Sequence, residues 1–527
     1  MIHLELEDTS YESDIRELTA AFFPPREAEK CEITVRFYAK CPGPEDGREA
    51  ETREALEGGR EPGISEVLEN GRKAAVCGEP ETAPDSGRTD CGKTVWFEVC
   101  VNGAQQETSA REHVPDYSNR FETKNQLKRL LYGTLRKLTG RTLPWGTLTG
   151  IRPTKIAMGQ LKAGMTEEAV MDDMEKTYLA SREKTSLCVD IARREMELLE
   201  PLNCESGYSL YVGIPFCPTT CLYCSFTSYP ISLWKDRMDS YLEALYREMD
   251  YVAQVMRGRT LDTVYFGGGT PTSLEASQLD ALITRLKAAF PFDQVKEFTV
   301  EAGRPDSITE EKFAVLKKHG VTRISINPQT MNQKTLDLIG RRHTVEMVEE
   351  SFHMARRMGF DNINMDLILG LPGEDLEDVR RTLARVKALG PDSLTVHSLA
   401  IKRAARLNMF KEQYEELVIT NTQEMIELTA ACAREMGLLP YYMYRQKNMA
   451  GNFENVGYAA PGKACIYNIL IMEEQQTIAA CGAGTTTKVY FPAENRLERA
   501  ENVKNVEQYI DRLDEMMERK GRLLSLL

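Results

Sequence analysis

The sequence predicts an α/β protein whose central domain is built on parallel strands, and two observations support this prediction. From Tyr208 onward, six short apolar runs alternate with longer amphipathic segments, which is typical of repeated strand–helix units. The first 200 residues differ, because strand-like runs come first and helical segments follow, as in an α+β domain. At about 150 residues per domain, the 527 residues provide for two to four domains with their own cores.

Composition and charge exclude several classes of protein. Hydrophobic residues make up 42% of the chain and charged residues 28%, which is typical of globular proteins. The formal charge of −14 leaves no surplus of cations to neutralise phosphates, which argues against nucleic-acid binding. No apolar run reaches the roughly 18 residues of a membrane span, and the N-terminus lacks a signal-peptide pattern. We therefore expect a cytoplasmic protein without a membrane span.

The N-terminal α+β domain is expected to span residues 1–200. Alternating apolar residues predict strands at Ile2–Leu6, Glu32–Tyr38 and Thr94–Val101, and leucines at helical spacing predict a helix at Arg120–Leu138. Further helices are expected as far as about Leu199. Arg152 and Lys155, in GIRPTK, could contact a phosphate or a propionate, although solvated charges at a helix-entry turn explain them more simply.

Within this domain, residues 41–92 form an acidic insertion. The segment contains thirteen acidic and six basic residues, a net charge of −7, with no aromatic and only six β-branched side chains. Such a segment cannot bury enough apolar surface to offset the entropy that ordering would cost. The insertion is therefore predicted to be disordered.

The central domain is expected at residues 205–400. Its strands are predicted at Leu210–Pro215, Thr263–Phe266, Phe298–Ala302, Arg323–Asn327, Ile363–Ile368 and Ser393–His397. The helices between them are predicted at Asp239–Val255, Ser277–Ala289, Glu310–His319, Val345–Met358 and Leu376–Leu389. Serial units of this kind imply parallel strands with right-handed crossovers, and both a doubly wound sheet and a barrel or part-barrel fit. In either fold, ligands bind at the carboxyl ends of the strands.

Three of the thirteen cysteines are clustered, directly after the first strand of the central domain. They are Cys217, Cys221 and Cys224, in CPTTCLYC. Soft sulfur ligands select zinc or an iron–sulfur cluster. Zinc usually takes four protein ligands, and no second pair follows here, whereas three ligands to a cubane leave one iron open. The other ten cysteines are scattered, and we expect ordinary thiols rather than a disulfide framework.

Polar residues follow the other predicted strands at or near their carboxyl ends. After the second strand comes GGGTPT, in which Gly268 and Gly269 leave the backbone open to a polar ligand. The later ones are Glu301, Gln329, Arg341 and Asp366. An acid at such a position can accept hydrogen bonds from ribose hydroxyls, and an arginine can bind a carboxylate with two parallel bonds. Any one of them alone could equally be a structural polar group, but their occurrence in barrel order favours a site.

The cysteine spacing, C-x-x-x-C-x-x-C on the loop after the first strand, resembles that of the radical S-adenosylmethionine (SAM) enzymes. The resemblance implies that Cys217, Cys221 and Cys224 are the catalytic, metal-ligating residues of a [4Fe–4S] cluster, with SAM on the open iron. It also implies cleavage of SAM to a radical that removes hydrogen from a substrate. The implied fold is a partial (β/α)6 barrel, which matches the six units.

Other motifs narrow the resemblance. YVGIPFC, GGGTPT, the NPQT-to-GRRHT stretch and DLILGLPGE are similar to the oxygen-independent coproporphyrinogen III oxidase group of radical SAM enzymes. GIRPTKI, HSLAIKRAARLN and YNILIMEEQQTIAACGAGTTTK are most similar to its long branch, named HemZ. The residues that align with SAM-contacting positions are Tyr211, Gly268, Gly269, Thr270, Glu301, Gln329, Arg341, Asp366 and Ala400.

The resemblance implies a function. It is the oxidative decarboxylation of coproporphyrinogen III to protoporphyrinogen IX, with a reductant for the cluster such as flavodoxin or ferredoxin. Two residues depart from the pattern: Phe226 replaces a cysteine of the true dehydrogenases, and Gly213 replaces a usual histidine. The alternatives are a haem-binding chaperone of the same group, which Phe226 slightly favours, and radical chemistry on another tetrapyrrole.

The substrate side is expected in an α/β extension at residues 401–527. Its basic and aromatic candidates for a propionate-bearing macrocycle are Arg403, Arg406, Tyr442, Tyr444, Arg445, Lys447 and Asn452. A solvated helix face explains the first two equally well, and a strand in the core explains the tyrosines slightly better. His343 and His397 could bind haem or donate protons, although a helix cap and a core histidine, respectively, are the simpler explanations. The Gly-rich CGAGTTTK resembles the segment that closes the group's site.

Overall fold

The computed structural model describes residues 1–23, 31–40, 92–102, 110–150, 152–400, 405–409, 418–446 and 453–527. Apart from Gly92, the insertion predicted at 41–92 lies outside the described residues, as do Arg403, Lys447 and Asn452. The chain forms two compact units, Met1–Thr142 and Leu143–Leu527. This boundary differs from the one expected near residue 200.

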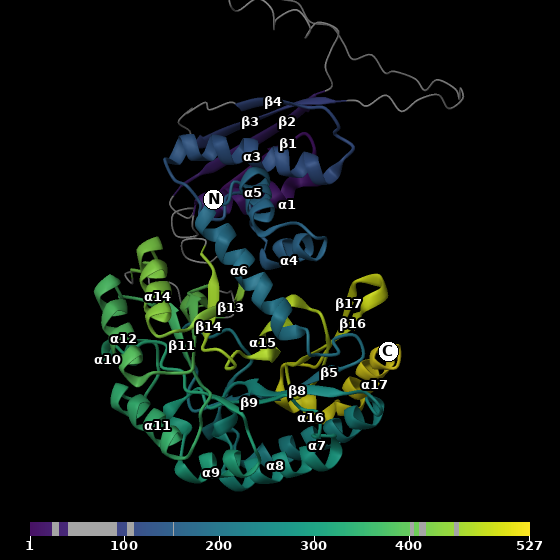
Figure 1. The fold of residues 1–527 in the computed structure, drawn as a ribbon, viewed down its shortest axis with the longest axis vertical. Helices are drawn as coiled ribbons and strands as arrows, with labels where there is room; N and C mark the ends of the chain where they lie inside the picture. The colour runs from purple at the N-terminus through teal and green to yellow at the C-terminus, as the bar shows by residue number, and fades with distance from the viewer. Residues whose placement is uncertain are drawn as a thin grey trace, which may run out of the picture. The chain divides into compact units, whose positions relative to one another are not determined.

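The first unit is a four-stranded sheet with two helices on one face (Figure 1). Its strands, in sheet order, are β1 (Ile2–Leu6), β2 (Ile33–Lys40), β3 (Lys93–Val101) and β4 (Ala110–Val114), and its helices are α1 (Glu12–Phe22) and α3 (Arg120–Thr139). β1 and β2 are parallel and the other pairs antiparallel. Alternate residues of β2 are buried against the helices, which confirms the period-2 pattern of this strand.

Three helices that we expected in the N-terminal domain belong to the second unit. They are α4 (Thr154–Lys162), α5 (Glu167–Tyr178) and α6 (Arg182–Leu199). A buried ion pair attaches them, because Lys184 Nζ on α6 lies 2.7 Å from Glu454 Oε1, whose other oxygen accepts from Trp145 Nε1 at 2.7 Å. Both members of the pair are about 1% exposed. The contact joins residues 270 positions apart, so helical periodicity alone could not predict it.

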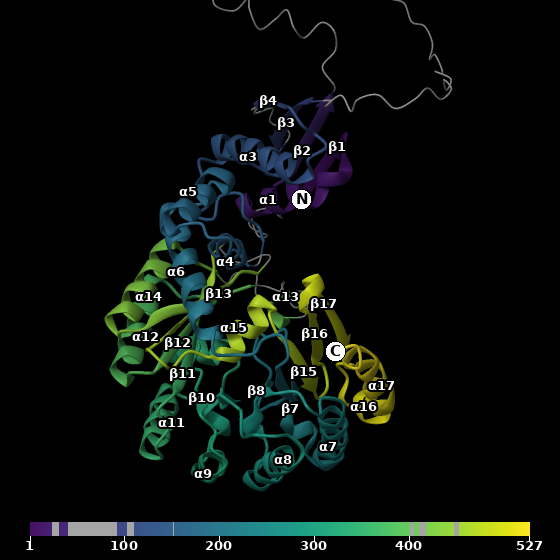
Figure 2. The same cartoon turned by 45° about the vertical axis from the view of Figure 1, so that its right-hand side comes forward.

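The second unit contains one eleven-stranded sheet, and six of its strands are the predicted parallel ones (Figure 2). These are β5 (Tyr208–Ile214), β8 (Leu261–Gly268), β9 (Glu297–Glu301), β10 (Arg323–Ser325), β11 (Ile363–Leu369) and β12 (Ser393–Ser398). They lie side by side in chain order with no reversal. A doubly wound sheet has a switch point at which the order reverses, so the order selects the part-barrel.

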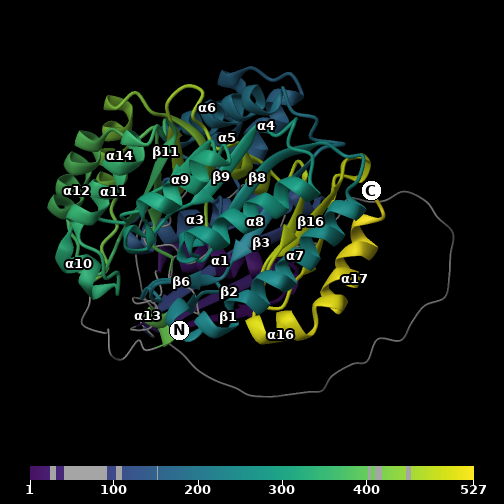
Figure 3. The ribbon, with the colours of Figure 1, turned by 90° about the horizontal axis from the view of Figure 1, so that it is seen from below.

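Helices cover the outer side of these strands. They are α7 (Met238–Val255), α8 (Ala276–Ala289), α9 (Glu310–Lys318), α10 (Gln333–Leu338), α11 (Val345–Arg357) and α12 (Leu376–Leu389). Figure 3 shows α7, α8 and α9 in front of β8 and β9. Their apolar faces and the strands form one large core, in which the strand side chains are almost completely buried. The partial (β/α)6 barrel predicted from the sequence is therefore confirmed.

The C-terminal residues complete the sheet at both edges. β14 (Asn455–Ala459) pairs with β12 and with β13 (Leu439–Tyr444), and β15 (Thr477–Cys481) lies parallel to β5. Beyond it are β16 (Thr486–Phe491) and β17 (Arg496–Glu501). The remaining elements are β6 (Phe216–Cys217), β7 (Tyr229–Pro230), α13 (Arg406–Met409), α14 (Gln423–Glu435), α15 (Ile466–Glu473), α16 (Val506–Asp511) and α17 (Leu513–Leu524).

The sheet curves around α15. This helix packs against both β8 and β13, although five strands separate those two in the sheet. Tyrosines from the inner face of the sheet and from α15, among them Tyr265, Tyr442 and Tyr467, form a second core there. In the part of the chain that the structure describes, no helix is both long enough and apolar enough to cross a membrane.

Candidate active site

The cysteine loop lies at the carboxyl end of β5, as predicted. The loop leaves the short strand β6, and contacts with the chain that follows α10 fix its middle. Leu222 N donates to Ile339 O at 2.9 Å, and Thr219 Oγ1 donates to Gly340 O at 2.8 Å. All three thiols are free: Cys221 is buried, and Cys217 and Cys224 are partly exposed.

Few protein groups other than backbone contact these thiols. Thr270 Oγ1 donates to Cys217 Sγ at 3.4 Å, and Arg304 Nη1 donates to Cys221 Sγ at 3.5 Å. Burial raises the pKa of Cys217 to about 12 and also raises that of Cys224. Without a bound metal these two thiols remain protonated at neutral pH, and metal binding would release their protons.

The donor set fits a cluster better than a single ion. Among the described residues, no group of three Cys, His, Asp or Glu side chains is arranged to bind one metal ion. A cubane has a different requirement, because each thiolate binds an iron of its own and the three need not converge on one point. Three free thiols on one loop, one of them beside the Arg304 guanidinium, meet that requirement.

The glycine turn after β8 packs against the strand that leads to the cysteines. Gly269 N donates to Ile214 O at 2.8 Å, and Thr270 N donates to Phe216 O at 2.7 Å. A Cβ at Gly269 would lie 2.6 Å from Phe216 O, and Gly268 has a φ of +106°. Both positions therefore require glycine. Because these two amides bond within the protein, a ligand here would meet the carbonyls of the turn.

Two acids face the inside of the curved sheet. Burial raises the pKa of Glu301 to about 7; Tyr265 Oη, which donates to Glu301 Oε1 at 2.6 Å, opposes the rise, and Asp366 adds to it. Burial alone would raise the pKa of Asp366 as well, but His397 and the amide of Asn364 hold it below its usual range. At neutral pH the site thus contains one ionised carboxylate and one that is close to its midpoint.

Gln329 and Arg341 differ in what they offer a ligand. Gln329 has a φ of +68°, its N–H donates to Asp366 O at 2.9 Å, and its buried Oε1 has no hydrogen-bond partner among the described residues. Such an unmet acceptor favours a ligand with a donor group. Arg341 is 3% exposed and donates to Tyr223 Oη at 3.2 Å and to Gly303 O at 2.8 Å. Its guanidinium therefore stabilises the cysteine loop and does not present two free N–H groups to a carboxylate.

Sequence reasoning missed part of this site. Tyr265 and Tyr467 stack with ring centroids 4.5 Å apart, and Tyr211 lies beside both, with its centroid 6.0 Å from each. Tyr467 comes from α15, more than 250 residues away from Tyr211 in the chain. We call the inward-facing side chains Tyr211, Tyr265, Glu301, Asp366, His397, Tyr442, Tyr444 and Tyr467 the interior cluster. Of this cluster, only Tyr265 and Tyr467 were not predicted from the sequence. Ala400 lies just after β12 and is partly buried.

Some of the predicted substrate residues have structural roles instead. Arg152 Nη1 donates to Met472 O at 2.9 Å and lies 2.7 Å from Glu474, so it caps the carboxyl end of α15. Arg445 donates to Leu148 O at 2.6 Å and is buried. His343 is completely buried.

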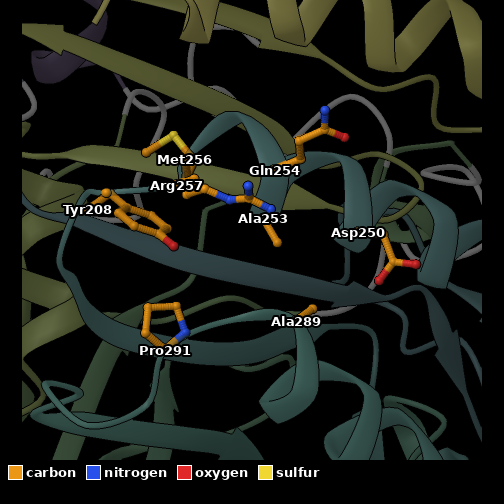
Figure 4. A pocket seen from close by; sticks show the side chains of 9 residues that line it. Tyr208, Asp250, Ala253, Gln254, Met256, Arg257, Ala289 and Pro291 are labelled. Carbon is orange, nitrogen blue, oxygen red and sulfur yellow. The ribbon is translucent and has the colours of Figure 1, made fainter.

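Two cavities lie at opposite ends of the strands. The larger, ≈ 340 Å³, is lined by Tyr208, Asp250, Arg257 and Pro291 among others and contains none of the predicted site residues (Figure 4). The smaller, ≈ 230 Å³, lies at the carboxyl ends. Its lining includes Tyr211, Gly213, Phe226, Gly268, Thr485 and Lys504. The smaller cavity therefore adjoins the cysteine loop and the glycine turn.

Comparisons with known proteins agree with this geometry. The model of the radical SAM superfamily matches residues 211–386. The oxygen-independent coproporphyrinogen-III oxidase-like protein HemZ of Bacillus subtilis (strain 168) is 41% identical over 438 residues, which cover 81% of this chain and 87% of that protein. The chain belongs to the radical SAM superfamily, in its HemZ-like branch. Members of this superfamily use a [4Fe–4S] cluster and SAM.

Other relatives match a smaller share of this chain. The heme chaperone HemW of Bacillus subtilis is 38% identical over 195 residues, 37% of this chain and 51% of that protein. The oxygen-independent coproporphyrinogen III oxidase of Escherichia coli (strain K12) is 34% identical over 196 residues, 37% of this chain and 42% of that protein. The structure of HemN from Escherichia coli covers 61% of this chain and 72% of its own at 25% identity, with a TM-score of 0.49.

Proposed function

We propose that this radical SAM protein converts coproporphyrinogen III to protoporphyrinogen IX without oxygen. The observation that carries the proposal is the 41% identity to the HemZ protein over 87% of that protein's length. The match is more than twice as long as the 195 residues shared with the HemW chaperone.

In this proposal, Cys217, Cys221 and Cys224 hold the cluster. SAM is bound by residues around the glycine turn and by the inward-facing acids. When bound, the reduced cluster and SAM supply a carbon-centred radical that can remove hydrogen from an unactivated carbon. Glu301 and Asp366 accept hydrogen bonds from the ligand's polar groups, and the unmet Oε1 of Gln329 accepts another. The stacked tyrosines of the interior cluster exclude water from the site on the inside of the curved sheet.

The proposed reaction acts on propionate side chains. A propionate loses one hydrogen atom from the carbon β to its carboxylate, and then loses CO2 and one electron to leave a vinyl group. This occurs on two of the four propionates. The cluster needs a reductant of the flavodoxin or ferredoxin type, and the electron from the substrate needs an acceptor.

One observation favours the alternative of a haem-binding chaperone. Phe226 occupies the position of a cysteine found in the dehydrogenases, and its side chain is 71% exposed beside the cysteine loop. An exposed aromatic ring suits a flat macrocycle. Chemistry on another tetrapyrrole is compatible with the same observation.

Product analysis separates these functions. Reconstituted protein is incubated anaerobically with SAM, coproporphyrinogen III and reduced flavodoxin, and porphyrins and 5′-deoxyadenosine are quantified. The proposal predicts protoporphyrinogen IX with 5′-deoxyadenosine in proportion, and neither product with Cys221→Ala. Cys221→Ala should also lose the iron–sulfur absorption near roughly 400 nm, which reports cluster binding independently of turnover. Tight haem binding without any product would contradict the proposal and support a chaperone.

A further inference from the structure

The proposed function gives the inward-facing His397 no role, and gives Tyr444 only a share in excluding water. His397, on β12, is 27% exposed to the inside of the barrel. Its Nδ1 lies 3.1 Å from Tyr444 Oη, and its Nε2 lies 3.9 Å from Asp366 Oδ2. The imidazole thus lies between the carboxylate that we propose binds SAM and a phenol from another strand.

The sheet is built to bring Tyr444 to this position. β13, which carries Tyr444, is separated from β12 by β14. On β14, Gly457 leaves room for the neighbouring Tyr442 ring, because a Cβ there would lie 1.8 Å from Tyr442 Cε1. Tyr442 and Tyr444 stack with centroids 6.3 Å apart, and Tyr444 meets the His397 ring edge to face. Gly457 thus leaves space for Tyr442, and Tyr442 stacks on the Tyr444 ring that contacts His397.

Two hydrogen bonds to asparagine side chains position Asp366. Asn364 Nδ2 donates to its Oδ1 at 2.7 Å, and its own N–H donates to Asn327 Oδ1 at 3.2 Å. The second carboxylate oxygen, Oδ2, is the one that faces His397. Asp366 is 21% exposed, so a ligand can reach it.

One arrangement satisfies the hydrogen-bond chemistry of the three groups. A neutral imidazole that presents Nε2–H to a carboxylate must accept a hydrogen bond at Nδ1. The Tyr444 hydroxyl can donate that bond, and its 3.1 Å separation from Nδ1 permits it. When Tyr444 donates to Nδ1, the imidazole proton lies on Nε2, which faces Asp366 Oδ2.

We propose that His397, oriented by Tyr444, is a positioning residue that holds Asp366 in the rotamer in which it binds SAM. The inference rests on the proposed SAM site. His397 acts through Asp366 and does not itself contact SAM. His397 Nε2 is 3.9 Å from Asp366 Oδ2, so the contact in this structure is electrostatic, and it becomes a positioning hydrogen bond when the imidazole closes that gap. Such a bond typically contributes about 10-fold to ligand affinity.

The test is the dissociation constant of SAM, measured by equilibrium dialysis on anaerobically reconstituted protein. We expect His397→Phe, which keeps a ring but removes the donor, to weaken SAM binding about 10-fold. His397→Gln keeps a donor near the Nε2 position and should restore most of the affinity. Tyr444→Phe should weaken binding less than His397→Phe. His353→Phe, on the exposed face of α11, is the matched control and should bind SAM like the unmodified protein.

The double variant decides how His397 acts. If His397 acts through Asp366, Asp366→Asn with His397→Phe should bind SAM no more weakly than Asp366→Asn alone. If His397→Phe weakens SAM binding as much in the Asp366→Asn protein as it does alone, the inference is overturned. The inference is also overturned if His397→Phe leaves the SAM affinity unchanged and raises the KM for the tetrapyrrole, because His397 would then be a substrate contact. Failure of the unmodified protein to bind SAM would instead contradict the proposed function.

Discussion

Gly213 offers a sharp test of how the C-terminal segment closes the site. A Cβ at Gly213 would lie 2.5 Å from Thr485 Cγ2, closer than carbon atoms approach in proteins. Thr485 cannot move aside easily, because its Oγ1 donates to Gly482 O at 2.8 Å and its carbonyl accepts from Asn502 N at 2.9 Å. Overpacking of this kind costs about 1–3 kcal/mol. We therefore expect Gly213→Ala to lower the free energy of unfolding by that amount.

The matched rescue is Thr485→Ser, which removes the Cγ2 methyl group and keeps the hydroxyl. Alone it should cost about 1 kcal/mol for the lost buried methyl. Combined with Gly213→Ala it should cost less than the sum of the two, since the added methyl fills the vacated space. Urea denaturation followed by near-ultraviolet circular dichroism measures all four proteins. Additive losses, or a Gly213→Ala protein as stable as the unmodified one, would refute the proposed packing of residues 481–487 against β5.

Three more predictions concern buried ionisable groups. Lys520 and Glu248 form an ion pair at 1% and 0% exposure, so Lys520→Met should cost about 3–5 kcal/mol in urea denaturation, and Glu248→Gln in the same chain should recover part of it. Burial and nearby Glu473 raise the pKa of Glu195, so this residue's contribution to stability is lost as the pH rises through its folded-state pKa. Glu195→Gln should flatten the pH dependence of unfolding, and an unchanged slope would contradict the assignment. Because the pKa of Glu301 is about 7, SAM affinity should rise between pH 6 and pH 8, and Glu301→Gln should abolish that rise in equilibrium dialysis.

Local patterns predicted the central domain well. The six parallel strands begin and end within a few residues of their predicted limits, for example Ile363–Leu369 against Ile363–Ile368. The alternation of short apolar runs with amphipathic segments is a local property, so it survives in a single sequence. The cysteine spacing and the glycine turn are local as well, and the structure brings both to the same end of the barrel.

Contacts between distant parts of the chain could not be predicted. β15 pairs with β5 although their residues are more than 260 positions apart. The Lys184–Glu454 pair likewise joins α6 to a distant part of the second unit. Arg152 was a candidate for anion binding because its partner, Glu474, lies far away in the sequence. Tyr467 was missed for the same reason, since nothing local distinguishes it from an ordinary helix residue.

The central claim is hydrogen abstraction from the propionate carbon β to the carboxylate. The most direct measurement uses coproporphyrinogen III deuterated at those carbons, with mass spectrometry of the 5′-deoxyadenosine formed in the anaerobic reaction. We predict that one molecule of 5′-deoxyadenosine forms for each vinyl group produced, and that each such molecule carries one deuterium. 5′-Deoxyadenosine without deuterium, or protoporphyrinogen formed without 5′-deoxyadenosine, would contradict the claim.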